Sequence, residues 1–139
     1  MSDIRITDNT ESFLTAFDRA LRNGLEAIGM TAEAHAKKKI TENDSVDTGR
    51  LRNSITYAIS GEKAHIDTYN DDEGNTYSYS GTAPKDNQLA AYIGTNVEYA
   101  EYVELGTSRA PAYPYLRPAA TEHTEEYRRI FKAALDSAK

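Results

Sequence analysis

The chain has 139 residues, the size of one domain, and only 39% of them are apolar, which leaves room for a modest core and excludes a core plus a separate catalytic domain. It has no cysteine, which excludes disulfide bonds and thiolate chemistry, and its formal net charge of −6 argues against a protein that holds nucleic acid by its phosphates. The polar start lacks the features of a signal peptide and no apolar run approaches the roughly 20 residues of a membrane span, so we expect a single domain over residues 1–139 that is made in the cytoplasm and contacts no membrane.

The first strong pattern predicts a helix from about Asn9 to Thr41. Asp8, followed three residues later by Glu11, is typical of a capping box at its start. A helix of this length is too long for a small domain to cover, so we expect it to project or to pack against a second copy. Apolar residues recur along it at steps of three or four and form one stripe: Phe13, Phe17, Leu21, Leu25, Ile28, Ala32, Ala36 and Ile40.

A small antiparallel sheet is predicted after the polar, turn-rich segment 41–49. Apolar and polar residues alternate from Ile55 to Ile59, which indicates a strand. Residues 61–63 are suited to a hairpin turn, and His65 to Tyr69 to a second strand paired with the first. Leu89 to Thr95 is predicted to be a third strand.

The stretch from Asn70 to Gln88 is rich in Asn, Asp, Gly, Ser and Thr, and it predicts a long mobile loop between strands. Tyr77 and Tyr79 lie in its middle. Two interpretations of these tyrosines have equal weight: they anchor a partner surface, or they pack back onto the sheet.

Two further helices complete the predicted fold. Asn96 to Leu105 suggests a short helix closed by Gly106, and a proline-rich link leads to a final helix that begins near Leu116. The expected fold class is therefore α+β, with a long N-terminal helix, a small antiparallel β-sheet with a long hairpin loop, a short helix and a C-terminal helix. The apolar face of the final helix would contain Leu116, Ala120, His123, Tyr127, Ile130 and Ala134.

Motifs for catalysis are missing from the sequence. His35, His65 and His123 have no metal-ligand spacing, and we expect His123 to be packed or to lie at an interface. There is no glycine-rich phosphate loop and no serine nucleophile elbow. We therefore expect no enzyme, no catalytic residue, no cofactor and no metal site. Glu98, Glu101 and Glu104 share one helical face, which is either a solvated face or a negative rim toward a partner or a lumen.

Three sequence blocks occur in order along the chain. The first, Thr48 to Ile55, has the pattern Thr-Gly-x-Leu-x-x-Ser-Ile, and the second, Gly94 to Thr107, has the pattern Gly-Thr-x-x-x-Tyr-Ala-x-Tyr-x-Glu-x-Gly-Thr. The third, Pro114 to Ala119, has the pattern Pro-aromatic-Leu-x-Pro-Ala. Together with the long first helix, these blocks resemble the tail-component or neck-protein family of HK-type lambdoid siphophages and related prophages.

The resemblance implies a virion protein at the head–tail junction or the end of the tail. Such proteins act as closed homo-oligomeric rings, often of six subunits, that contact other neck and tail proteins. DNA would pass through the lumen without sequence-specific binding, and an acidic inner wall would repel its phosphates.

The blocks are suited to architecture. We expect Thr48 to cap the turn that Gly49 allows, Gly94 and Gly106 to make tight turns, and Glu104 to bond to Arg50, Arg109 or a backbone turn. Tyr99 and Tyr102 would clamp a neighbouring element. The expected structural or interface residues are Thr48, Gly49, Leu51, Ser54, Gly94, Tyr99, Tyr102, Glu104, Gly106, Thr107, Pro114, Leu116 and Pro118.

Two other functions stay open at this point. One is a small phage-associated hydrolase that processes DNA, against which the missing metal spacing argues. The other is a transient tail-assembly chaperone that leaves before the virion matures.

Overall fold

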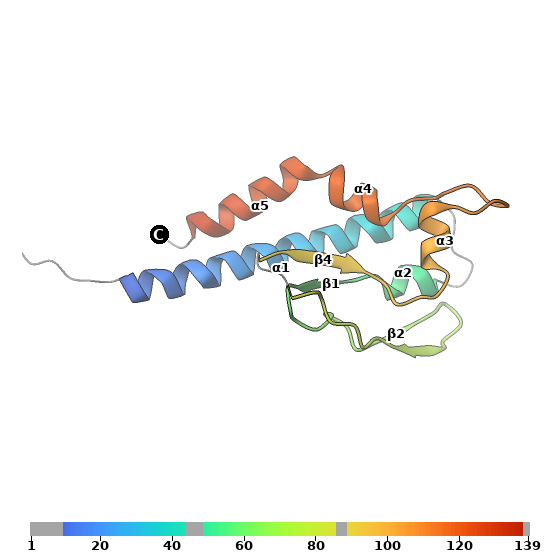
Figure 1. Cartoon of the computed structure of the whole chain (residues 1–139), viewed down its shortest axis with the longest axis horizontal. Coiled ribbons are helices and arrows are strands. Elements are labelled where there is room, and N and C mark those ends of the chain that lie inside the picture. The colour runs from blue at the N-terminus through green and yellow to red at the C-terminus, as the bar shows by residue number, and fades with distance from the viewer. Residues whose placement is uncertain (1–9, 44–48, 86–88, 138–139) are drawn as a thin grey trace, which may run out of the picture.

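The computed structural model describes residues 10–43, 49–85 and 89–137 and has the expected α+β fold, built around one long helix (Figure 1). This helix, α1 (Thr10–Glu42), runs along most of the length of the molecule. Helices α4 (Leu116–Thr121) and α5 (Thr124–Asp136) pack along one side of it, and strands β1 (Thr56–Ile59) and β4 (Ala91–Gly94) pack along the other. The expected cap at Asp8 lies outside the described residues.

Two glycines allow α1 to be approached closely from both sides. A Cβ atom at Gly29 would lie 2.7 Å from Cδ2 of Tyr57 on β1, and one at Gly24 would lie 3.1 Å from Cβ of Ala134 on α5. Real Cβ atoms essentially never come as close as the first distance, so a larger residue at 29 would push the sheet away. The glycines lower the helix propensity of α1, and in return they permit its contacts with the sheet and with α5.

The strand pairing differs from the expected hairpin. β1 pairs antiparallel with β4, with Thr56 opposite Gly94 and Ile59 opposite Ala91. Between β1 and the residues around His65, one backbone hydrogen bond, from His65 N to Tyr57 O, takes the place of a paired strand. The predicted pairing of β1 with His65 to Tyr69 is therefore wrong. Both β1 and β4 contact α1, whereas His65 is exposed, so the more apolar strand has taken the place beside β1.

The predicted long loop contains a second, separate two-stranded sheet. β2 (Thr68–Asn70) pairs antiparallel with β3 (Thr76–Ser78), and the turn between them is organised by Asp71. The Asp71 carboxylate accepts hydrogen bonds from the backbone N–H groups of Glu73 and Asn75, both 2.9 Å. The prediction of one long loop is therefore wrong over this part, because the polar residues that suggested it build an ordered Asx turn. Residues 86–88 lie outside the described part.

The remaining helices are shorter than expected. α3 (Ala100–Leu105) begins later than predicted, and a five-residue helix, α2 (Arg50–Ser54), occupies the first sequence block. The expected single final helix is interrupted at Glu122 and His123, which separate α4 from α5. This turn brings His123 against α1, where its ring stacks on that of His35.

The core lies where α1, α2, α3 and α4 meet the two sheets. Its largest fully buried side chains include Tyr115, Ile40, Leu51 and Ile55. Among the described residues, no helix has the length and apolar character needed to cross a membrane.

Candidate interaction site

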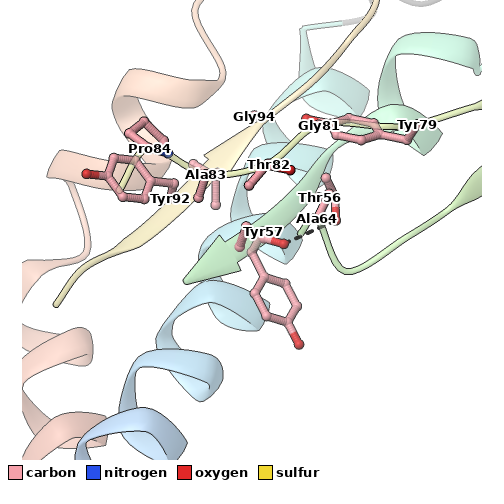
Figure 2. A pocket seen from close by; sticks show the side chains of 12 residues that line it. Thr56, Tyr57, Ala64, Tyr79, Gly81, Thr82, Ala83, Pro84, Tyr92 and Gly94 are labelled. Carbon is pink, nitrogen blue, oxygen red and sulfur yellow. Dashed lines mark hydrogen bonds between the residues drawn. The ribbon is translucent and has the colours of Figure 1, made fainter. Parts of the chain in front are cut away.

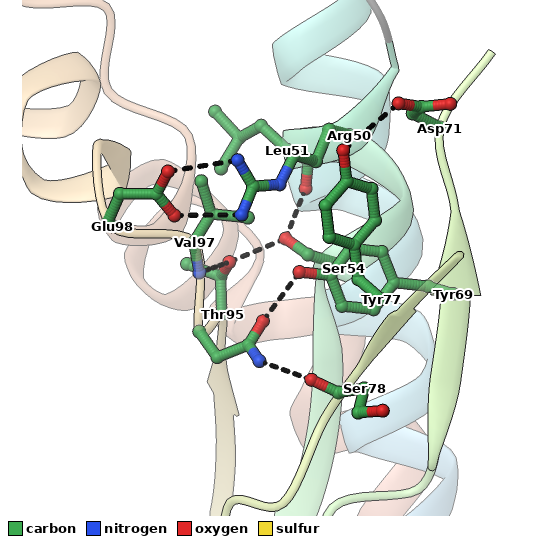
Figure 3. Close-up of polar contacts among 11 residues, drawn as sticks. Arg50, Leu51, Ser54, Tyr69, Asp71, Tyr77, Ser78, Thr95, Val97 and Glu98 are labelled. Carbon is green, nitrogen blue, oxygen red and sulfur yellow. Dashed lines mark hydrogen bonds and ion pairs between the residues drawn. The ribbon is translucent and has the colours of Figure 1, made fainter. Parts of the chain in front are cut away.

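The first and second sequence blocks meet through Arg50, at the start of α2. Its guanidinium donates two hydrogen bonds to the carboxylate of Glu98, 3.0 and 2.8 Å long (Figure 3). The same group lies 4.3 Å from the centre of the Tyr77 ring and 5.8 Å from that of Tyr99. One arginine thus joins α2, the hairpin and the segment before α3, and it pairs with Glu98, not with Glu104 as one of our expectations had it.

The hydroxyl groups of Ser54 and Thr95 connect the same two blocks. Ser54 is fully buried, donates to the carbonyl oxygen of Leu51 at 2.6 Å, and its Oγ contacts Oγ1 of Thr95. Thr95 also accepts a hydrogen bond from the backbone N–H of Val97, 3.1 Å. Each hydroxyl is engaged in holding the backbone, as Figure 3 shows, which gives Ser54 a structural role and no access to a substrate.

The hairpin is fastened to the second block by Asn96, a residue that our sequence analysis missed. Its side-chain oxygen accepts a hydrogen bond from the Tyr69 hydroxyl, and its amide donates to the Ser78 carbonyl oxygen, both 2.8 Å. Tyr69 and Tyr77 stack with ring centres 5.4 Å apart. Tyr77 and Tyr79 are both half-buried against the core, which agrees with the second of the two interpretations that we weighed. No sequence spacing links positions 69, 77 and 96.

Glu104 holds the start of α4. Its carboxylate accepts hydrogen bonds from the backbone N–H groups of Tyr115, at 3.2 and 3.3 Å, and of Leu116, at 2.7 Å. A carboxylate at a helix N-terminus satisfies donors that the helix itself leaves unpaired. Tyr115 is fully buried and donates to the carbonyl oxygen of Ala100, 2.9 Å, and burial raises the pKa of its hydroxyl. The third block is thereby joined to the second.

The other block residues have structural positions. Gly106 has φ 77°, and a Cβ atom there would lie 2.7 Å from the backbone nitrogen of Ala112, so the turn after α3 requires glycine. Gly94 does not make the tight turn that we expected: it ends β4 opposite Thr56 and is not in the left-handed region.

Thr48 lies outside the described residues, while Gly49 has φ 73° at the start of α2. The Thr107 hydroxyl accepts from the backbone N–H of Ala110, the Pro114 carbonyl accepts from the Asn43 side chain, and the Pro118 carbonyl accepts from Glu122 N.

One apolar surface points outward from this framework. Tyr102 and Leu105, three residues apart on α3, are 61% and 69% exposed, and Tyr113 is 42% exposed. The hydrogen bond from Tyr113 N to Val103 O, 2.8 Å, holds the loop after α3 alongside that helix. We call Tyr102, Leu105 and Tyr113 the α3 surface. Tyr99 is half-buried against the core, so the expected pair of clamping tyrosines is divided, with only Tyr102 outward.

A second apolar surface lies at the opposite end of the molecule. Leu14 and Phe17, three residues apart in the first turns of α1, are 56% and 38% exposed, where this helix extends beyond the sheet (Figure 1). We call these two residues the α1 surface.

The acidic row of Glu98, Glu101 and Glu104, in α3 and the segment before it, is mostly engaged within the chain. Glu98 binds Arg50 and Glu104 binds backbone N–H groups, so two of the three carboxylates that could form a negative rim have internal partners. Arg50 also lowers the pKa of Glu98, after a larger effect from the backbone N–H of Glu98 itself. Glu101 is the exposed residue between them.

The hollow between the β1–β4 sheet and the segment 79–84 offers no acid–base chemistry. It is lined by small and aromatic residues, among them Tyr79, Ala83, Pro84 and Tyr92, and no residue that lines it carries a charge (Figure 2). Catalysis by carboxylates or histidines therefore has no support from this hollow.

Comparison with protein families decides the identity. The model of the family described as "Bacteriophage HK97-gp10, putative tail-component" matches residues 4–106. The chain belongs to this family. The match includes the first block and the second block up to Gly106. The third block lies outside the match and is joined to the second by the hydrogen bonds that Glu104 accepts. Neither the curated proteins nor the solved structures contain a match to the chain.

As a member of the HK97-gp10-like family, the chain is a phage tail component. Its block residues divide into two groups. Leu51, Ser54 and Glu104 contact other parts of the chain and hold the blocks together. Tyr102 and Leu105 belong to the second block too, but their side chains are exposed. The sequence pattern alone could not separate these groups, because a tyrosine suits a core and an interface equally well.

Proposed function

We propose that this tail component is a subunit of a closed ring at the head–tail junction or at the end of the tail. The observation that carries the proposal is the pair of unlike apolar surfaces at opposite ends of the chain, one on α3 and one on α1. In a ring, each subunit contacts the next through two different surfaces, and the rotation between them closes the assembly. A single self-complementary surface would favour a twofold dimer instead.

The composition of the α3 surface supports a protein partner. Aromatic residues are enriched at the centres of protein interfaces, and a hydrophobic neighbour such as Leu105 excludes water around them. The partner that we assign to the α3 surface is the α1 surface of a second copy, with other neck and tail proteins above and below the ring. A ring of six is the stoichiometry implied by the resemblance of the sequence blocks.

DNA would pass through the lumen of this ring without sequence-specific contacts. The net charge of −6 supports this role, because a chain with more acidic than basic residues repels the phosphates of DNA on average. Glu98 and Glu104 have partners within the chain, which leaves Glu101 to face outward. We therefore assign the repulsion of DNA to the overall negative charge and not to these three carboxylates.

Within this proposal the chain is not an enzyme, and it stays in the virion as a structural protein. The uncharged lining of the hollow in Figure 2 and the internal hydrogen bonds of Ser54 support a structural role. Cleavage of DNA or of a model ester that follows the purified chain would overturn the structural role. Absence of the chain from purified particles would favour the transient chaperone.

The change Tyr102→Ala tests the ring. Because Tyr102 is mostly exposed, its loss should leave the urea unfolding curve of the isolated chain within about 0.5 kcal/mol. Loss of an aromatic anchor from an interface costs about 2 kcal/mol, or roughly 30-fold in affinity, at every contact of the ring. In phage we expect filled heads and free tails that fail to join, or tails with abnormal ends, counted by electron microscopy.

Leu89→Ala is the matched control, because Leu89 is an exposed apolar residue outside both surfaces. Particles carrying Leu89→Ala should assemble normally. If Tyr102→Ala particles also assemble and infect normally, the α3 surface is not an interface of the ring.

A further inference from the structure

Two histidines that are distant in the sequence meet beside a glutamate. His35 lies in the C-terminal half of α1, and His123 and Glu126 lie at the start of α5. Nε2 of His35 is 2.6 Å from Oε1 of Glu126, across 91 positions of the chain, and the two imidazole rings stack with centres 3.5 Å apart and planes inclined by 4°. One nitrogen from each histidine and one carboxylate oxygen all lie within 4.8 Å of one another.

The local structure explains why these side chains converge. His123 and Glu126 are three positions apart, which places them on one face of the turn that opens α5. The interruption between α4 and α5 directs this face toward α1. His35 lies there, three positions after Ala32, which is buried. The nearby Tyr127 hydroxyl donates to the carbonyl oxygen of Ala119 and is engaged outside the cluster.

The chemistry of the three groups points to one class of ion. Imidazole nitrogens and a carboxylate oxygen are ligands for zinc and similar divalent transition metals, whereas magnesium and calcium prefer oxygen alone. In a tetrahedral site with Zn–N bonds of about 2.0–2.1 Å, two ligand atoms lie about 3.4 Å apart. The ligand atoms of this cluster, which lie within 4.8 Å of one another, would shift to that separation when an ion binds.

We propose that His35, His123 and Glu126 form a binding site for a divalent transition-metal ion, zinc in class, that fastens α5 to α1. A nitrogen lone pair lies in the plane of its own ring, so two parallel rings cannot point to one ion, and binding turns one imidazole out of the stack. The three side chains leave a fourth position, which water fills. This site is independent of the ring proposed above.

An ion at this site would stabilise the packing of α5 on α1. No described residue of α5 is fully buried, so this helix is held to α1 by half-buried contacts alone. An ion that joins the two helices stabilises the folded state by an amount that grows with the logarithm of the ion's concentration above its dissociation constant, because the unfolded chain does not hold the three ligands together.

The test uses the full chain without a purification tag, freed of metal with a chelator. Titration with zinc chloride in a calorimeter should show one ion bound per chain, and zinc at about 100 times its dissociation constant should raise the unfolding midpoint by about 5–10 °C. Cobalt(II) should give the visible absorption of a tetrahedral ion with nitrogen ligands. The change His123→Gln should weaken binding by about 100-fold or more.

The matched control is His65→Gln, because His65 stacks on Tyr57 with ring centres 4.7 Å apart and is no member of the cluster. It should bind zinc as the unchanged chain does. Since His123→Gln removes a packed ring, Glu126→Gln is the second variant, and it should also weaken binding while the fold is kept. Absence of stoichiometric binding, or equal binding by Glu126→Gln and His65→Gln, would overturn the site and leave a metal-free histidine pair.

Discussion

The two ends of α1 are held in different ways. At its C-terminal end, Ala36 and Ile40 are fully buried against Leu51, Ile55 and Tyr115, and hydrogen bonds connect the blocks around them. At its N-terminal end, Leu14 and Phe17 are exposed, and the neighbouring α5 has no fully buried residue. The block end thus has a buried core, whereas the other end leaves apolar area that a second chain can cover.

This contrast explains how one small domain can serve as a building unit. The rigid block end presents Tyr102 and Leu105 in a defined geometry, so little conformational freedom is lost there when a partner binds. The less buried end can adapt to the surface that it meets. Substitutions of buried residues at the block end should therefore affect folding, and those at the α1 surface should not.

The largest expected effect is that of Leu51→Ala. Leu51 is buried in the core between α1, α2 and α4, so its truncation removes apolar contacts and leaves a cavity. We expect a loss of about 2–5 kcal/mol in the free energy of unfolding, measured by urea denaturation. Leu14→Ala, the same change at the α1 surface, should alter it by less than about 0.5 kcal/mol. Equal losses in the two variants would remove the distinction between the ends.

A smaller effect is expected for Glu104→Gln. The amide keeps the size of the side chain but weakens the charge-assisted hydrogen bonds to the N–H groups of Tyr115 and Leu116. We expect a loss of about 1–2 kcal/mol by the same denaturation assay. Glu101→Gln, on an exposed position of the same helix, is the control and should be nearly neutral. A neutral Glu104→Gln would mean that α4 starts without help from this carboxylate.

The smallest effect concerns acid and Asp71 in the hairpin turn. Hydrogen bonds from the side chain and backbone of Asn75, with others from Glu73 and Tyr77, lower the pKa of this carboxyl below its ordinary value. The folded state therefore gains stability from Asp71 above the unfolded pKa, near 4, and loses it as the pH falls through the lower folded pKa. Asp71→Asn should be less stable than the unchanged chain at pH 7, and the difference should shrink on acidification. A difference that does not change with pH would show that Asp71 acts without its charge.

The sequence predicted the elements better than their partners. The apolar stripe from Phe13 to Ile40 predicts α1 because its period of three to four continues over most of the thirty-three residues of this helix, a strong local signal. The pairing of β1 with β4 could not be predicted, since the competing strand at His65 is nearer in the sequence and the choice depends on which strand α1 covers.

The candidate site was predictable in the same uneven way. The block pattern singled out Ser54, Tyr102 and Glu104, but it could not say which of them face inward. The contacts of Asn96 and the meeting of His35 with His123 depend on how distant segments fold together, and no local spacing reports that.

Disulfide trapping in assembled phage tests the ring most directly, because the chain contains no cysteine of its own. The double variant Leu14→Cys with Tyr102→Cys would carry one thiol on each proposed surface. If the α3 surface of one copy meets the α1 surface of the next, mild oxidation of particles gives a ladder of covalent oligomers that ends at the closed ring, while each single variant stays monomeric. Disulfide-linked dimers from a single variant, or no linkage in infectious particles of the double variant, would contradict the head-to-tail ring.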